Sequence, residues 1–292
     1  MFIQLEDARI FFDVEGTGLS PQGPVMREKP VMLCLHGGPG LDHTSFRPEL
    51  APLAAQVQLI YLDQRGHGRS SRGDVSHWSL AQWAEDVRSF CDALGIEHPI
   101  VLGTSFGGYV AMAYAIRYPS HPAKLVLAST SARGTANAER RANMLHAFEK
   151  RGGPIAREAL RRALDERDEA AYADFAAICG PLYNRRQPDP AAMLRILRNP
   201  DILPFFEGPG GEGATFDLVA ELTAIRAPTL ILAGEDDPIT PPEEQERIAS
   251  AMAPGLARLV RFSGCGHGVL RDDAEGMRAA IAKFVTSAEE VG

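Results

Sequence analysis

The chain has 292 residues, 45% of them hydrophobic and 23% charged, a composition that is ordinary for a soluble globular protein. Its formal net charge of −8 disfavours nucleic acid or an anionic membrane surface as a partner, and no apolar run approaches the ~20 residues that span a bilayer. The N-terminus lacks the pattern of a signal peptide, and the four scattered cysteines are typical of reduced thiols, so we expect a cytoplasmic protein.

Short apolar segments alternate with longer helical patterns along most of the chain. This alternation predicts an α/β fold with a mostly parallel, twisted sheet and helices on both faces. Continuous apolar character indicates strands buried on both faces. A helix is predicted over residues 80–95, where apolar side chains recur at helical spacing. The predicted strands are residues 8–16, 31–37, 57–63, 100–105, 124–130, 229–235 and 257–262.

Residues 133–215 interrupt this alternation. The segment is helical in pattern, rich in arginine and alanine, and contains no convincing strand. We predict that it forms a helical cap inserted into a core domain made of residues 1–132 and 216–292. The glycine-rich stretch 208–216 then leads back towards the last strands.

Ser105 lies between glycines at the point where an apolar run gives way to a helical pattern. Residues 103–107 fit G-x-S-x-G, the nucleophile-elbow motif, in which small neighbours allow a sharp turn from strand to helix. The strand at 100–105 and a helix that starts at Phe106 and ends before Pro119 provide the required context. The motif therefore predicts that Ser105 is a nucleophile.

A serine nucleophile needs a general base, and the base needs an orienting carboxylate. The elbow motif predicts the chain order Ser, then Asp or Glu, then His. His267 follows the last predicted strand, and the loop after the strand at 229–235 supplies the acid, with Asp236 and Asp237 both open. All these residues fall at the carboxyl ends of parallel strands, where open α/β sheets form their sites.

An oxyanion hole would complete this site with two backbone N–H groups. One is the N–H of Phe106, directly after the nucleophile, and the other comes from an earlier glycine-rich loop. In that loop, residues 36–40, we favour the N–H of Gly38, with Gly37 as the second choice. No spacing of metal ligands such as H-E-x-x-H occurs, and we expect neither a metal nor another cofactor.

Four stretches together resemble the α/β-hydrolase fold. They are H-G-G-P-G at 36–40, D-Q-R-G-H-G-R-S at 63–70, G-T-S-F-G-G at 103–108 and G-E-D-D at 234–237, followed by a Gly-His pair near the C-terminus. The first two are most similar to the prolyl iminopeptidase branch. The resemblance covers the sheet domain but not the cap. It implies that the triad acid is Asp237, the third residue after Gly234.

The resemblance also implies an activity and a substrate. It implies a serine hydrolase that forms an acyl-enzyme and releases an N-terminal proline or small residue from a small molecule or short peptide. Prolyl iminopeptidases bind the amino group of the substrate with acidic side chains near the cap. The nearest acids here are Glu207 and Glu212, and Pro238 stands where some members carry a glutamate.

Two other functions stay open at this stage. Esterases and lactonases share the same loops, so a carboxylesterase or lactonase acting on small acyl substrates is the main alternative. A catalytically silent protein that binds a small ligand in the same pocket is the third. The sequence does not indicate an oligomeric state.

The remaining reactive side chains are predicted to have structural and not catalytic roles. His36 precedes the oxyanion loop and is expected to brace it by hydrogen bonding. Arg65 and His67 are expected to hold the loop at 63–70 together. Cys265 is expected to be a packed thiol, because nothing around it would stabilise a thiolate.

Overall fold

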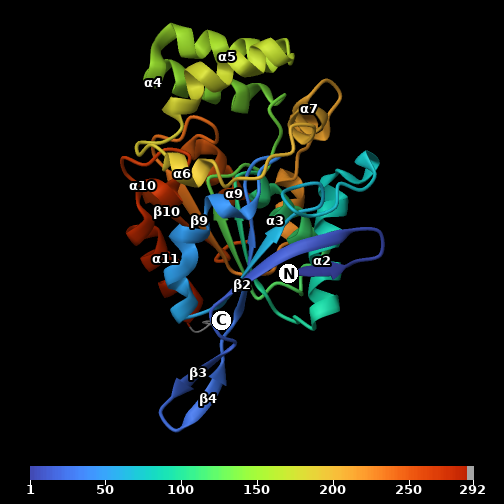
Figure 1. The fold of residues 1–292 in the computed structure, drawn as a ribbon. Coiled ribbons are helices and arrows are strands. Elements are labelled where there is room, and N and C mark those ends of the chain that lie inside the picture. Colours follow the sequence, from blue (N-terminus) through green and yellow to red (C-terminus); the bar gives the residue numbers. More distant parts are fainter. Residues whose placement is uncertain (288–292) are drawn as a thin grey trace.

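A mostly parallel sheet forms the centre of the computed structural model, which describes residues 1–287 (Figure 1). Within those residues the sheet has eight strands in the order β1-β2-β6-β5-β7-β8-β9-β10. Strands β1 and β2 run antiparallel at one edge, and the rest are parallel. All seven predicted strands are present. The strands are β1 (Phe2–Gln4), β2 (Arg9–Glu15), β5 (Val31–Leu35), β6 (Gln58–Asp63), β7 (Ile100–Thr104), β8 (Lys124–Ala128), β9 (Thr229–Gly234) and β10 (Ala257–Phe262).

The hairpin of β3 (Leu19–Gln22) and β4 (Val25–Glu28) was not expected from the sequence. It projects away from the body of the molecule, and within residues 1–287 its two strands pair only with each other (Figure 1). Its side chains are mostly exposed, so no apolar pattern marks its strands. Gly23 adopts a positive φ of 62° at the turn, a conformation that glycine takes without strain.

Helices cover both faces of the sheet, as the sequence predicts. Along β5, Leu33 and Leu35 belong to one apolar cluster and Met32 and Cys34 to the other, because successive side chains of a strand point to opposite faces. On the first face lie α2 (Leu80–Leu94), α3 (Phe106–Arg117) and α9 (Pro242–Ala251). On the second lie α1 (Arg47–Leu50), α10 (Val269–Asp272) and α11 (Ala274–Thr286).

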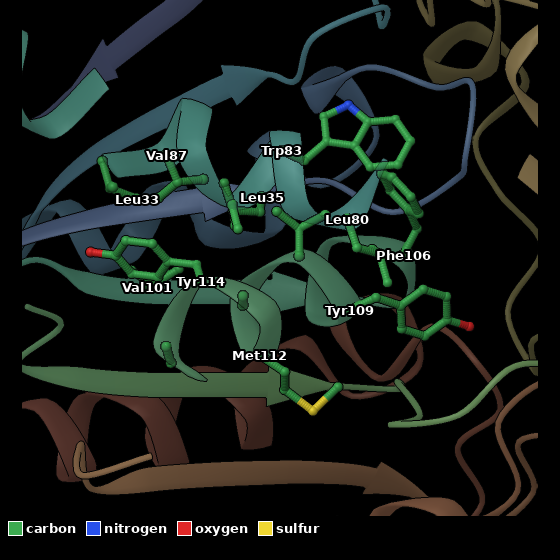
Figure 2. Packing of buried hydrophobic residues seen from close by; sticks show 14 of the residues in the cluster. Leu33, Leu35, Leu80, Trp83, Val87, Val101, Phe106, Tyr109, Met112 and Tyr114 are labelled. Atoms are coloured by element: carbon green, nitrogen blue, oxygen red, sulfur yellow. The ribbon is translucent and has the colours of Figure 1, made fainter. Parts of the chain in front are cut away.

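Helix α2 shows how local sequence sets these elements. Ser79 accepts the N–H of Gln82 at its start, and Gly95 takes a left-handed conformation at its end. The buried side chains Trp83 and Val87 face the sheet and α3 (Figure 2). The structure also contains short 3₁₀ helices: η1 (His43–Ser45), η2 (Ala51–Ala55), η3 (Val75–His77), η4 (Gly180–Leu182) and η5 (Val219–Ala224).

Residues 133–215, which we call the cap segment, form helices with their own small apolar cluster at one end of the molecule (Figure 1). The chain leaves and re-enters the core side by side, since the N–H of Gly134 donates to the carbonyl of Phe216 at 2.7 Å. The boundaries 132/133 and 215/216 stay a prediction. The helices are α4 (Ala138–Asp165, kinked at Gly153), α5 (Glu169–Cys179), α6 (Pro190–Met193), α7 (Ile202–Glu207) and α8 (Glu212–Thr215).

None of the helices within residues 1–287 combines the length and apolar character needed to cross a membrane.

Candidate active site

Ser105 occupies the sharp turn between β7 and α3. Its backbone has φ 52° and ψ −119°, a strained conformation for a residue with a side chain. The glycines around it are required by close packing. A Cβ on Gly107 would lie 2.1 Å from the carbonyl oxygen of Leu35, and one on Gly103 would lie 2.4 Å from the carbonyl oxygen of Gly107. The turn therefore has the geometry that the G-x-S-x-G pattern predicts.

The three side chains predicted to act together form a chain of hydrogen bonds, with His267 in the middle. Nε2 of His267 lies 3.0 Å from Oγ of Ser105, and Nδ1 of His267 lies 2.9 Å from Oδ2 of Asp237. The carboxylate of Asp237 is fully buried, and the imidazole is 15% exposed. A hydroxyl, an imidazole and a buried carboxylate in this order form the arrangement that activates a serine.

The carboxylate of Asp237 is held by its own loop. It accepts the backbone N–H groups of Ile239 at 2.8 Å and Thr240 at 2.9 Å, and the hydroxyl of Thr240 at 2.8 Å. The neighbouring Asp236 points elsewhere and pairs with Arg185 of the cap segment. Of the two acids that the sequence left open, Asp237 is the one in contact with His267.

The glycine-rich loop after β5 passes directly beside Ser105. A Cβ on Gly37 would lie 3.3 Å from Cβ of Ser105. Gly38 is the next residue and has a φ of 140°, which favours glycine. Phe106 begins α3, so its N–H is one of the first four in the helix, which have no partner within it. These are the two N–H groups predicted to hold an oxyanion.

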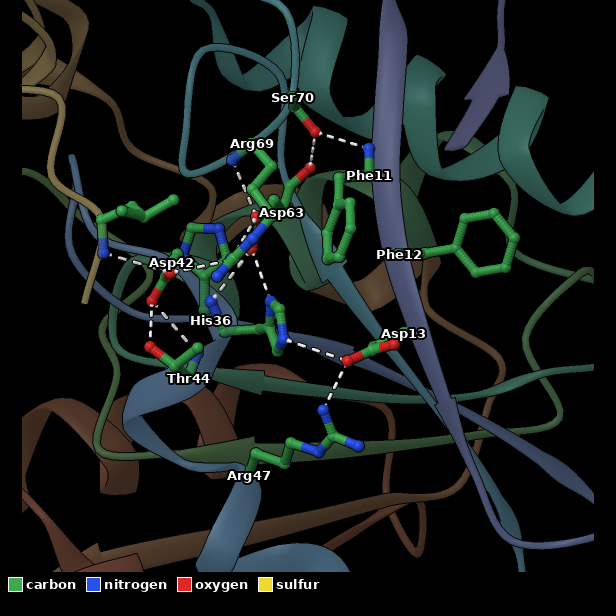
Figure 3. Close-up of polar contacts among 12 residues, drawn as sticks. Phe11, Phe12, Asp13, His36, Asp42, Thr44, Arg47, Asp63, Arg69 and Ser70 are labelled. Atoms are coloured by element: carbon green, nitrogen blue, oxygen red, sulfur yellow. Dashed lines mark hydrogen bonds and ion pairs between the residues drawn. The ribbon is translucent and has the colours of Figure 1, made fainter. Parts of the chain in front are cut away.

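Polar contacts brace the loops after β5 and β6, two strands that lie on the same side of β7 (Figure 3). Nε2 of His36 accepts the N–H of Gln64 at 3.1 Å, which ties the oxyanion loop to the loop after β6. Asp63, the last residue of β6, accepts Nδ1–H of His43 at 2.6 Å and the N–H of Arg69 at 2.9 Å. The bracing role that the sequence suggested for His36 agrees with these bonds.

Glu207 and Glu212, the acids expected to receive a substrate amine, are both half-buried and both have partners in the protein. Glu212 accepts the N–H of Leu80 at 2.8 Å, at the start of α2. Glu207 accepts the hydroxyl of Thr135 at 3.3 Å. Burial raises the pKa of both carboxyl groups above its ordinary range. The structure does not by itself give either one a substrate-binding role.

The other reactive side chains have structural surroundings. Arg65 is buried and forms ion pairs with Asp7 and Asp86, both at 2.7 Å. His67 is buried, with Nδ1 2.8 Å from the carbonyl of Arg65. Burial raises the pKa of the Cys265 thiol to about 11. In the part of the chain that the structure describes, no group of three or more His, Cys, Asp or Glu side chains is placed to hold a metal ion.

Several residues support the site from outside the motifs, and the sequence does not predict them. Gln245, fully buried in α9, donates from Nε2 to the carbonyls of Thr130 at 2.9 Å and Thr240 at 3.0 Å. The hydroxyl of Thr130 in turn donates to the carbonyl of Ser105 at 2.8 Å. Only Thr240 had a recognisable signal, because an aspartate side chain often accepts backbone N–H groups a few residues further along the chain. Tyr183, Asn184 and Asp272, which contact the His267 loop, had none.

This fold and site place the chain in a known family. The family model described as alpha/beta hydrolase fold matches residues 30–274, so the chain belongs to the alpha/beta hydrolase fold family. The fold class and the family predicted from the sequence are confirmed.

Similar proteins are hydrolases of several kinds. The chain is 29% identical over 249 residues to the proline iminopeptidase PfmaB of Pestalotiopsis fici, covering 82% of this chain and 86% of that protein. It is 27% identical over 274 residues to the bifunctional esterase/perhydrolase DCH of Acinetobacter calcoaceticus, covering 89% and 93%. The crystal structure of the proline iminopeptidase of Mycobacterium smegmatis matches with a TM-score of 0.75 and 25% identity, covering 98% and 97%. The predicted hydrolase class and the resemblance to proline iminopeptidases are thus confirmed.

Proposed function

We propose that the protein is a serine hydrolase in which Ser105 is the nucleophile, His267 the general base and Asp237 the orienting acid. The carrying observation is the pair of hydrogen bonds that His267 makes, 3.0 Å to Ser105 Oγ and 2.9 Å to Asp237 Oδ2. As Oγ bonds to the substrate carbonyl carbon, its proton passes to Nε2. The N–H groups of Phe106 and Gly38 hold the oxygen that becomes negative.

The second half of the reaction uses the same groups in reverse. Nε2 of His267 gives its proton to the leaving group as the bond to the acyl carbon breaks, which leaves an acyl-Ser105 ester. Water then adds to that ester and loses a proton to Nε2, and the proton returns to Oγ as the acid is released. Asp237 holds the imidazole in one tautomer and stabilises its charged form throughout.

The first substrate we propose is a small molecule or short peptide with an N-terminal proline or small residue. The similarity to two proline iminopeptidases supports this choice. In such a substrate Glu207 or Glu212 would bind the free amino group. We also propose that residues 133–215 form a cap over the site, because the loop of His267 is hydrogen-bonded to that segment.

A carboxylesterase or lactonase acting on small acyl groups is the second candidate. One observation favours it: both candidate amine-binding carboxyl groups already have partners within the protein, and burial raises the pKa of each. A raised pKa makes a carboxyl group a weaker partner for a cationic amine. The similarity to an esterase/perhydrolase supports the same candidate.

A rate comparison of proline arylamide with short-chain p-nitrophenyl esters tests both candidates. Ser105→Ala should lower kcat by at least ~10⁴-fold on whichever substrate is cleaved, and a fluorophosphonate should label only the wild type. Ser250→Ala, an exposed serine at the end of α9, is the matched control and should keep full activity. Unlabelled wild-type protein, or full activity in Ser105→Ala, would refute the proposal.

The same comparison separates the substrates. If the arylamide is cleaved, Glu207→Gln and Glu212→Gln identify the amine-binding acid, because losing it should raise KM for the amide but not for the esters. If only esters are cleaved, the peptidase proposal fails and the esterase proposal stands.

A further inference from the structure

The loop that carries His267 is bonded to the cap segment as well as to the core. The backbone N–H of His267 donates to the carbonyl of Tyr183 at 2.7 Å, and the N–H of Gly268 donates to Oδ1 of Asn184. The Tyr183 ring also stands edge-on to the imidazole, with ring centroids 6.0 Å apart and an interplanar angle of 85°. The cap segment therefore contacts the proposed base at its backbone and at its ring.

One buried carboxylate joins the two segments. Oδ2 of Asp272, at the end of α10, accepts the N–H of Gly266 at 2.8 Å and of Arg185 at 2.9 Å, and Oδ1 accepts the N–H of Arg186 at 2.8 Å. Gly266 directly precedes His267, whereas residues 185–186 belong to the cap segment. Hydrogen bonds to an ionised acceptor are about twice as strong as those between neutral groups. The carboxylate thus ties the cap segment to the backbone of the base.

The two segments fit closely where Asp272 joins them. A Cβ on Gly266 would lie 2.2 Å from the carbonyl oxygen of Tyr183 and 3.0 Å from Cα of Asn184. A side chain at position 266 would force the segments apart. The backbones therefore touch, and a shift of the cap segment here shifts the backbone next to His267.

We propose that Asp272 is a positioning residue for His267, and that through it the cap segment forms part of the support of the catalytic base. The inference rests on the proposed function, because it takes His267 as the base. A displacement of about 1 Å at a reacting group can cost ~10²-fold in rate. The 3.0 Å hydrogen bond from Nε2 to Ser105 Oγ is the contact that such a displacement would break.

Asp272→Asn tests the proposal with little change in size. It replaces one acceptor oxygen with an amide NH₂, which cannot accept the N–H groups that it would face. We expect kcat on the ester that the wild type cleaves to fall ~10–100-fold, with KM within ~3-fold, because no substrate contact is removed. The rate of fluorophosphonate labelling at Ser105 should fall in parallel.

Asp273→Asn is the matched control. It is the same change one residue further on, at a carboxylate that accepts the N–H of Gly276 at the start of α11. We expect its kcat and labelling rate to stay within ~2-fold of the wild type, since the N-terminal cap of a helix is all that it weakens.

A double variant distinguishes positioning from general loosening. If Asp272 acts through His267, its loss adds little once Asp237→Asn has already disoriented the imidazole, so the two losses combine to less than their product. If Asp272→Asn fails to fold, Asn184→Ala takes its place. That variant removes only the bond to Gly268 and should show the same loss in kcat at constant KM.

Three results would overturn the inference: an unchanged kcat in the folded variant, a loss that appears in KM, or full multiplication with Asp237→Asn. Failure of the proposed function is a separate outcome, in which the wild type itself is not labelled at Ser105. If the wild type is labelled at Ser105 and Asp272→Asn keeps its kcat, only the positioning role of Asp272 is refuted.

Discussion

The loops that carry Asp237 and His267 contact each other through the Asp237–His267 pair and through the bond from the N–H of Asp236 to the carbonyl of Cys265. The cap segment bonds to the two loops at different points. The acid loop is held from within the core, by Thr240 and by the buried carboxamide of Gln245. The histidine loop is held by Asp272 together with residues 183–186 of the cap segment. The backbone of the proposed base His267 is therefore bonded directly to the cap segment. The carboxylate of Asp237 is bonded by groups of its own loop, and the cap segment contacts that loop at the neighbouring residue, where Arg151 and Arg185 bond to Asp236.

Ser105, the proposed nucleophile, is linked to the loop of Asp237 through side chains of the core. Gln245 donates to the carbonyl of Thr130, and the hydroxyl of Thr130 donates to the carbonyl of Ser105. Ser105 and Asp237 are thus linked through buried side chains of the core, and His267 is brought between them from the other side. Substitutions on the core side and on the cap side should therefore lower activity through different contacts.

The largest loss of activity is expected at Asp237, whose carboxylate contacts His267. Asp237→Asn keeps the size of the side chain but favours the wrong imidazole tautomer, so kcat should fall ~10⁴-fold with little change in the fold. Asp236→Asn is the control, because that carboxylate contacts Arg185 and not His267, and it should lose at most a few-fold. Steady-state kinetics of both variants measure this. If Asp236→Asn lowered kcat more than Asp237→Asn does, the acid of the triad would be Asp236.

A smaller effect is expected on the core side. Gln245→Met fills a similar volume but leaves the carbonyls of Thr130 and Thr240 without their buried donor, which should cost about 2 kcal/mol of unfolding free energy. The same change should lower kcat ~10-fold by loosening the acid loop against the nucleophile.

Denaturant unfolding and kinetics measure these two losses in one protein. Glu246→Gln is the matched control, since the Glu246 side chain is 42% exposed and pairs with Arg261, and it should change stability by less than about 0.5 kcal/mol. If Gln245→Met loses stability but keeps its kcat, Gln245 stabilises the core without aligning Asp237. The proposed role of the core in orienting the acid would then be wrong.

The motif residues of the site were predictable because their constraints are local. Gly103 and Gly107 are needed wherever a strand turns this sharply into a helix, so the sequence itself marks Ser105. The chain order of Ser105, Asp237 and His267 follows from the order of the strands that carry them. Each of these inferences needs only residues close together in the chain or the known order of the strands.

The support of His267 was not predictable because it rests on backbone groups far away in sequence. Tyr183 contributes a carbonyl, which any residue type would supply, so nothing at that position marks the contact. Asp272 accepts N–H groups 86 and 87 residues away. Glu212 likewise bonds to Leu80, 132 residues away, and nothing near Glu212 in the sequence marks that contact.

The smallest effect on activity is expected at Cys265, two residues before His267. Burial raises the pKa of this thiol to about 11, so at pH 8 only about one molecule in a thousand carries the thiolate. Cys265→Ala should keep kcat within ~2-fold. Alkylation of the wild type by iodoacetamide should be slow at pH 8 and should rise about tenfold per pH unit up to pH ~11, whereas an ordinary exposed thiol levels off above pH ~9.

The alkylation rate of Cys265 also gauges how firmly the cap segment holds the histidine loop. The thiol is 3% exposed, so reagent reaches it only when the loop opens. Asn184→Ala removes a bond from the cap segment without removing a charge, so it should speed alkylation at fixed pH, whereas Gln245→Met should not. Equal rates in both variants would mean that the loop opens independently of the cap, and the division of support between cap and core would then have to be abandoned.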